Sequence, residues 1–334
     1  MLKIVVAWGA TRETSQPAPR GYTLSTPSFD LRRRVVDGNV WLGHDGSDAA
    51  RDVAALPSYS IVPDVLPTEE AVGRAMLKEI EDATAAKEGE LVIILLGGRG
   101  AQALHRIWGE IARTNAGDEL LARLHVFTQD ALAPMRMNNG FSFVRDFERL
   151  LGPDFFRKVR SFASMRTDTD NLEAELASYI NKLEALGGID LLFLGLGPEA
   201  NAASHLAYIK PGSGSTASDM AGMIPISSSI LEHHISKFIA GGSAVTDADQ
   251  TECRAATHIL TLGPAAILSA RRIVQSIVDA STAPAKRESY KRLLEVKLSD
   301  DPQERARQLD ENPGLWLRLH ANVRSLVLPD LLGG

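Results

Sequence analysis

The sequence predicts an α/β protein whose mostly parallel sheet is covered by helices on both faces. Apolar runs of strand length alternate with helical patterns from residue 64 to residue 330, and this alternation is typical of βαβ units. Three of the runs are typical of strands buried on both sides. Residues 91–96 and 191–194 are unbroken apolar runs, and residues 124–128 are a third strand of the buried type. The first part of the chain is instead rich in turn-forming residues. We therefore expect a β-rich N-terminal addition of unknown purpose over residues 1–62 and one α/β domain over residues 63–334.

Local signals predict most of the other elements. In the N-terminal addition, short strand patterns occupy residues 3–8, 31–36 and 39–42. Thr68 followed by two glutamates is typical of a helix start, because a threonine side chain can accept hydrogen bonds from the first turn. Amphipathic patterns predict further helices at residues 102–113, 171–186 and 230–239.

Composition argues against several classes of protein. A formal net charge of −6 over 334 residues argues against a general nucleic-acid binder, although a small anionic ligand needs only local donors. The single cysteine, Cys253, excludes an internal disulfide bond and fits a reducing compartment. No apolar run approaches the roughly eighteen residues of a membrane span. We therefore expect a cytoplasmic protein with no nucleic-acid partner and no membrane partner.

Polar residues cluster directly after the strand pattern at residues 191–194. Gly195 and Gly197 end this strand at a place where a backbone could approach a ligand closely. The polar residues that follow are Glu199, Asn201, His205 and Lys210. In open α/β sheets, ligands bind beyond the carboxyl ends of the strands. An ordinary solvated loop would have the same spacing, so both interpretations stay open at this point.

A glycine-rich turn joins the strand pattern at residues 91–96 to the next helix. It consists of Gly97, Gly98, Arg99 and Gly100. A strand, a glycine turn and a helix N-terminus together present backbone N–H groups and a dipole to an anion. Arg99 could add a charge-assisted contact to a phosphate. Many glycine turns bind nothing, so this signal alone is weak.

The stretch LGLGPEANAASHLAYIKPGS resembles a known family signature. It is similar to the pattern G-x-G-x-D-G-H-[IL]-A-F-N-E-P-G-S of glucosamine-6-phosphate deaminases, which are relatives of the 6-phosphogluconolactonases. Three departures stand out. Glu199 replaces an aspartate, four extra residues precede His205, and Lys210 replaces a glutamate. The resemblance implies a Rossmann-like fold of the sugar-phosphate isomerase type.

The resemblance extends, with motifs in the same order, over about 80% of the chain. The glycine turn at residues 97–100 stands where the family has its phosphate loop. Asp130 matches the catalytic base of the family motif F-x-x-D-E-Y, although Ala131 and Leu132 do not match the two residues after it. Lys237 is the basic residue nearest to a family phosphate-binding arginine. Lys286 stands, shifted, near the lysine of the family motif G-x-x-K-A.

The C-terminal third also resembles the family. Residues 258–262 are similar to a family strand, and residues 266–278 are similar to the helix that follows that strand. The segment containing Trp316 and Leu319 resembles the closing segment of the family, which implies a last strand and places both side chains in the core.

The first hypothesis that the resemblance implies is a sugar-phosphate isomerase or deaminase. Asp130 would move the proton between neighbouring sugar carbons, and His205 would open the sugar ring while Glu199 orients it. The phosphate would be held by the loop at residues 97–100 with Lys237 or Lys286, and Lys210 could favour an anionic group. The chemistry requires no metal and no other cofactor. The expected partner is a small sugar phosphate, and a homo-oligomer stays open.

Two alternatives remain. In a lactonase, His205 would activate water against the ester carbonyl of a phosphosugar lactone, with no base needed at Asp130. In a catalytically lapsed member, the same pocket would bind a sugar phosphate without turning it over. The departures at Lys210 and Ala131 favour this last alternative.

Overall fold

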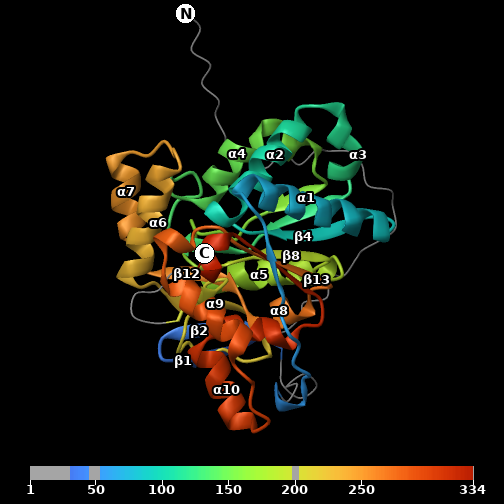
Figure 1. Ribbon diagram of the computed structural model, residues 1–334. Coiled ribbons are helices and arrows are strands. Elements are labelled where there is room, and N and C mark those ends of the chain that lie inside the picture. The colour runs from blue at the N-terminus through green and yellow to red at the C-terminus, as the bar shows by residue number, and fades with distance from the viewer. Residues whose placement is uncertain (1–30, 45–52, 198–202, 334) are drawn as a thin grey trace, which may run out of the picture.

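The computed structural model describes residues 31–44, 53–197 and 203–333 (Figure 1). In this part of the chain a seven-stranded sheet has the strand order β3-β14-β13-β8-β4-β5-β7. Its pairings are parallel. The strands are β3 (Pro63–Val65), β4 (Leu91–Leu95), β5 (Leu124–Thr128), β7 (Ser161–Ala163), β8 (Leu191–Leu194), β13 (Arg272–Ile277) and β14 (Val323–Val327). The predicted fold class is confirmed.

Helices cover both faces of this sheet. On one face lie α1 (Glu69–Ala86), α2 (Gln102–Ala112), α4 (Phe143–Lys158) and α6 (Ser228–Ala240). On the other face lie α5 (Leu172–Ala185), α8 (Pro264–Ser269) and α9 (Ala285–Glu295). The remaining helices are α3 (Asp118–Leu121), α7 (Asp247–Arg254) and α10 (Pro302–Glu311).

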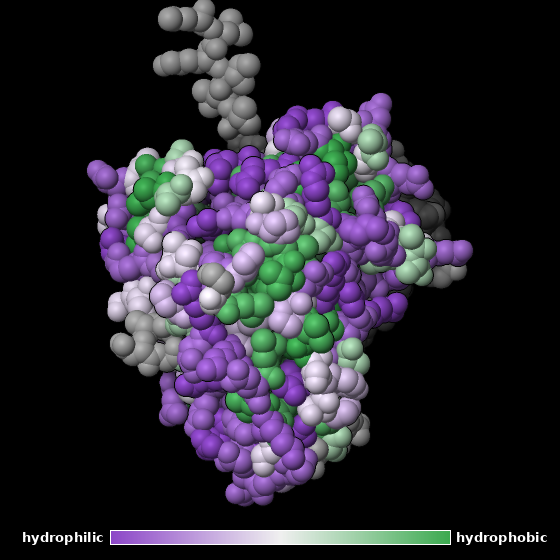
Figure 2. Space-filling view, viewed as in Figure 1, coloured by the Kyte–Doolittle hydropathy of each residue, from purple (hydrophilic) through white to green (hydrophobic). Residues whose placement is uncertain are grey.

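The sheet divides the core into two layers, and the side chains of β4 alternate between them. Leu91, Ile93 and Leu95 pack with the helices of the first face, while Val92 and Ile94 pack with those of the second. Successive side chains of a strand point to opposite faces, so an unbroken apolar run is what a doubly covered strand needs. The face of the protein shown in Figure 2 is mainly hydrophilic, with an apolar area across its middle.

A second sheet is antiparallel and contains the N-terminal strands. Its order is β1-β2-β11-β12-β6, with β1 (Arg32–Val36), β2 (Asn39–Gly43), β6 (Asp130–Ala133), β11 (Asp219–Pro225) and β12 (His258–Leu262). The predicted strands at 31–36, 39–42 and 258–262 are therefore confirmed, whereas the one at 3–8 lies outside the described residues. Because β2 pairs with β11, the β-rich addition extends a sheet of the α/β part. The boundary between residues 62 and 63 stays a prediction.

One predicted element is wrong. Residues 266–278 are not one helix, because α8 ends at Ser269 and residues 272–277 form the interior strand β13. The apolar residues Ile273, Val274 and Ile277 fit either period, and their β-branched side chains favour a strand. Pairing with β8 on one side and β14 on the other decides between the two.

Several local predictions agree with the structure. The side chain of Thr68 accepts a hydrogen bond from the backbone of Ala71 at 3.1 Å, which confirms the predicted start of α1. Trp316 and Leu319 are buried in a 3₁₀ segment that leads to the last strand. Among the described residues, no helix is long and apolar enough to span a membrane.

Candidate functional site

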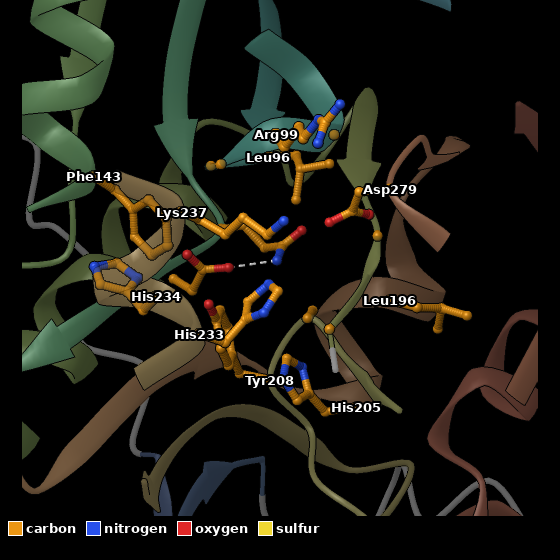
Figure 3. A pocket seen from close by; sticks show the side chains of 18 of the residues that line it. Leu96, Arg99, Phe143, Leu196, His205, Tyr208, His233, His234, Lys237 and Asp279 are labelled. Carbon is orange, nitrogen blue, oxygen red and sulfur yellow. Dashed lines mark hydrogen bonds between the residues drawn. The ribbon is translucent and has the colours of Figure 1, made fainter. Parts of the chain in front are cut away.

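A pocket lies beyond the carboxyl ends of β4, β5, β8 and β13 (Figure 3). Parallel strands bring these ends to one edge of the sheet, and the loops that follow them form the pocket wall. Helix α6 and the start of α9 complete the wall. Ten residues singled out from the sequence line this pocket: Gly97, Gly98, Arg99, Gly100, Asp130, Gly195, Gly197, His205, Lys237 and Lys286.

The glycine turn forms one side of the pocket and leads through a 3₁₀ turn (Arg99–Ala101) into α2. Gly98 has φ +70°, a conformation that disfavours other residues. A Cβ on Gly97 would lie 2.5 Å from the ring of Phe143, so the turn packs too closely for a larger residue. Arg99 lines the pocket, but its guanidinium bonds the carboxylate of Glu69, with Nη2 to Oε1 at 2.6 Å. The cation is therefore already partly neutralised.

A buried ion pair lines the pocket near the glycine turn. The Lys286 ammonium contacts the Asp279 carboxylate at 2.5 Å, and both side chains are less than a tenth exposed. Burial lowers the pKa of Lys286, an effect that Asp279 opposes. Burial alone would raise the pKa of Asp279, but the charge of Lys286 outweighs this effect and holds the pKa below its usual value. Because both partners are enclosed, neither can lose the other without a large cost.

The residues after β13 explain how Lys286 reaches the pocket. A 3₁₀ turn (Ala280–Thr282) takes up the extra residues that separate the strand from Lys286. Lys286 then lies in the first turn of α9. Lys237, on α6, donates a hydrogen bond to the Thr282 hydroxyl at 2.8 Å. The turn thus brings the shifted lysine and the α6 lysine to one wall.

Asp130 is the first residue of β6 and is 2% exposed. One carboxyl oxygen, Oδ2, accepts a hydrogen bond from Gln129 Nε2 at 2.5 Å. The other, Oδ1, is buried without a hydrogen-bond partner in the described part of the chain. Burial raises the pKa of Asp130 to about 7, against a smaller lowering by Gln129. A carboxyl with this pKa can both take up and release a proton near neutral pH.

His205 lies on β10 (His205–Leu206), opposite Gly197 on β9 (Leu196–Gly197). It is 3% exposed, and neither ring nitrogen has a hydrogen-bond partner among the described residues. Its ring stacks on that of Tyr208, with the centroids 4.3 Å apart. Burial lowers the pKa of His205 to about 3, with further lowering by Lys286 and His233. The imidazole is therefore neutral at physiological pH.

Two predicted site residues do not line this pocket in the described structure. Lys210 lies in a smaller neighbouring pocket that shares His205 and Tyr208, and its ammonium is 3.4 Å from the Pro225 carbonyl oxygen. Its contact with a ligand stays a prediction. Glu199 lies outside the described residues, so its orienting role also stays a prediction.

Sequence reasoning missed several residues of the pocket, among them Gln129, Tyr208, His233 and Asp279. Asp279 follows β13 directly, and its signal was hidden by the incorrect helix prediction for residues 266–278. His233 faces the pocket in Figure 3, and burial lowers its pKa to about 4. The neighbouring His234 instead bonds the Phe141 carbonyl oxygen at 2.7 Å, so the two histidines point to different surroundings.

Comparison with known proteins adds information on the fold. No protein-family model matches the chain, and no curated protein gives a significant sequence match. A monomeric glucosamine-6-phosphate deaminase matches with a TM-score of 0.61 at 18% identity, over 82% of this chain and 98% of that one. The 6-phosphogluconolactonase of Trypanosoma cruzi matches with a TM-score of 0.57 at 15% identity, over 83% and 97% of the two chains. That of Trypanosoma brucei matches with a TM-score of 0.55 at 17% identity, over 82% and 98%. As the sequence resemblance predicts, this chain has the fold of the glucosamine-6-phosphate deaminases and 6-phosphogluconolactonases.

Proposed function

We propose that this protein is a sugar-phosphate isomerase or deaminase that acts on a hexose or hexosamine phosphate. The reaction would open the sugar ring and move a proton between C2 and C1. One observation carries the proposal: Asp130, a buried carboxyl with a pKa of about 7, shares a pocket with a glycine turn and two lysines. An acid–base group beside an anion subsite is the arrangement that this chemistry needs.

The anion subsite would hold the phosphate. Its donors would be the backbone N–H groups of the glycine turn and the ammonium groups of Lys237 and Lys286. Among the described residues, the Lys237 ammonium bonds the neutral hydroxyl of Thr282 and no carboxylate, so its charge is available to a phosphate. With the phosphate fixed, the sugar carbons are held close to the acid–base groups, which lowers the entropic part of the barrier.

Asp130 would carry out the proton transfer. As a carboxylate it takes the proton from C2, leaving an enol or enamine, and it then returns a proton to C1. Oδ1, which has no hydrogen-bond partner among the described residues, would make this transfer, while Gln129 holds Oδ2. A pKa near the working pH suits both halves of the transfer.

His205 would open the ring. Its neutral imidazole takes the proton of the C1 hydroxyl while the bond between C1 and the ring oxygen breaks, and the proton then goes to the ring oxygen. Two ring nitrogens in the pocket wall, neither hydrogen-bonded to a described residue, support this role. Glu199, six residues before His205 in the sequence, remains the proposed orienting group.

The neutral His205 also favours a second candidate function, a phosphosugar lactonase. There the imidazole would take a proton from water as the water attacks the ester carbonyl. That reaction leaves the C2 proton in place and needs no base at Asp130.

One experiment separates these functions. The protein is incubated in deuterated water with hexose phosphates, hexosamine phosphates and phosphosugar lactones, and NMR follows the products. An isomerase or deaminase introduces deuterium at the proton-transfer carbon of its product, whereas a lactonase hydrolyses its substrate without exchange. If no compound is turned over but a sugar phosphate raises the melting temperature, the protein is a binder and the proposed enzyme function is wrong.

A further inference from the structure

The chain reverses direction at Ala207 and Tyr208, in the wall of the pocket. The backbone N–H of Leu206 donates to the Ile209 carbonyl at 3.1 Å, and that of Ile209 donates to the Leu206 carbonyl at 2.7 Å. The two residues between them have φ +47° and φ +63°. Two-residue turns with positive φ at both positions strongly favour Asn-Gly. Alanine and tyrosine occupy this turn against their own conformational preference.

Neighbouring strands hold the strained turn in place. The hydroxyl of Thr261, on β12, donates to the Ala207 carbonyl. Thr261 is fully buried and also pairs with Asp130 across β12 and β6. The same strand position thus supports both the turn and the acid–base carboxyl. Strain that the surrounding structure over-determines is found mainly at functional sites.

The turn places the ring of Tyr208 on the ring of His205. The two rings are nearly parallel, at 20°, with centroids 4.3 Å apart. The imidazole also lies against Gly197, where a Cβ would come within 1.6 Å of its Cε1 atom. Neither imidazole nitrogen is hydrogen-bonded to a described residue. Packing, and not a hydrogen bond from these residues, therefore fixes the ring.

We propose that Tyr208 is a positioning residue, whose ring holds the imidazole of His205 in its orientation in the pocket. This inference rests on the proposed function only where it assigns a reaction to His205; the packing itself does not depend on it. The ring, and not the hydroxyl, makes the contact with His205, because the two rings stack and the Tyr208 hydroxyl has no hydrogen bond to a described residue.

Two substitutions separate the ring from the turn. Tyr208→Phe keeps an aromatic ring and removes the hydroxyl. Tyr208→Asn keeps a residue that tolerates positive φ and removes the ring. Tyr208→Leu, which adds no polar group, checks that the effect of asparagine is due to the lost ring. Melting temperatures show that each variant is folded.

The first measurement is the titration of His205, followed by NMR in protein with labelled histidine. The charged and titratable groups that face it are Lys286, His233 and, beyond Tyr208, Asp130. In the wild type and in Tyr208→Phe, His205 should stay neutral from pH 8 to pH 5. In Tyr208→Asn and Tyr208→Leu, water reaches the freed ring, so His205 should titrate closer to the usual value of about 6.5.

The second measurement is turnover of the substrate that the compound panel identifies. Tyr208→Phe should retain kcat within about twofold, while loss of the ring should lower kcat by roughly tenfold to a hundredfold with little change in KM, as expected for misplacement of a reacting group. Unchanged titration of His205 in Tyr208→Asn and Tyr208→Leu overturns the inference. So does a Tyr208→Phe variant as impaired as these two. If no substrate is found, the proposed function fails, but the titration still decides the positioning role.

Discussion

The imidazole of His205 fills the space that a side chain on Gly197 would need. A Cβ atom on residue 197 would lie 1.6 Å from Cε1 and 2.2 Å from Nε2 of His205. The two residues face each other across the β9–β10 pair. Gly197 does not have a positive φ, so the close approach of the histidine, and not backbone strain, is what requires glycine here.

This contact predicts a strong coupling between two substitutions. Gly197→Ala should lower the free energy of unfolding by about 1–3 kcal/mol, because the new methyl group displaces the imidazole. In a His205→Ala background the same change should cost far less, since the space is then empty. Denaturant unfolding of the four proteins measures the coupling. An equal cost in both backgrounds would show that residue 197 is constrained by something other than His205.

Asp130→Asn tests the proton transfer directly. It keeps the shape of the side chain and removes the base, so an isomerase or deaminase should lose about two to four orders of magnitude in kcat. KM should change little, because the proposed phosphate-binding groups do not include Asp130. His205→Ala provides the comparison: a lactonase should lose activity mainly through that variant and keep most of it in Asp130→Asn. Undiminished turnover in Asp130→Asn would end the proton-shuttle assignment.

The same variant should change how stability depends on pH. The pKa of Asp130 is about 7 in the folded protein and about 4 in an unfolded chain. Folding therefore favours the protonated form, and this contribution is complete below about pH 4 and lost as the pH rises through about 7. Relative to Asp130→Asn, the wild type should lose up to about 4 kcal/mol of unfolding free energy between pH 4 and pH 8.

The titration of buried histidines does not account for this expected difference in the pH dependence of stability. Burial lowers the pKa of His105 and of His205 to about 3, so their effect on stability has the opposite sign, and it is shared by both proteins. The measurement is a set of denaturant titrations across the pH range. A difference between wild type and variant that is constant with pH would mean that Asp130 is ionised in the folded state.

Asp279→Asn tests whether Lys286 belongs to the proposed anion subsite. Lys286 then keeps its buried charge without a counter-ion, which should lower the free energy of unfolding by about 3–5 kcal/mol. Inorganic phosphate can replace the lost carboxylate, so its stabilising effect on the melting temperature should be larger in the variant than in the wild type. The control is Asp118→Asn, whose carboxylate is half exposed outside the pocket. A phosphate response no larger than that of the wild type would indicate that Lys286 does not bind the anion.

The sequence by itself determined the features that depend on local properties of the chain. The apolar runs of β4, β5 and β8 predict buried strands, because only a doubly covered strand needs apolar residues on both faces. Glycines after a strand predict a close backbone turn, and Gly98 adopts the positive φ that this requires. The choice of Asp130 instead came from the resemblance to the family motif F-x-x-D-E-Y, because an aspartate after a strand is by itself usually a helix cap or a turn residue.

Only the tertiary structure decided the features that depend on partners distant in the sequence. Residues 272–277 form a strand because β8 and β14 pair with them, although their apolar pattern also fits a helix. The same error hid Asp279, and with it the counter-ion of Lys286. Arg99 is paired with Glu69, thirty residues earlier in the chain. A local pattern specifies what an element can bury, but which charges meet is set by the packing of whole elements, because Coulomb and hydrogen-bond energies depend on distance in space.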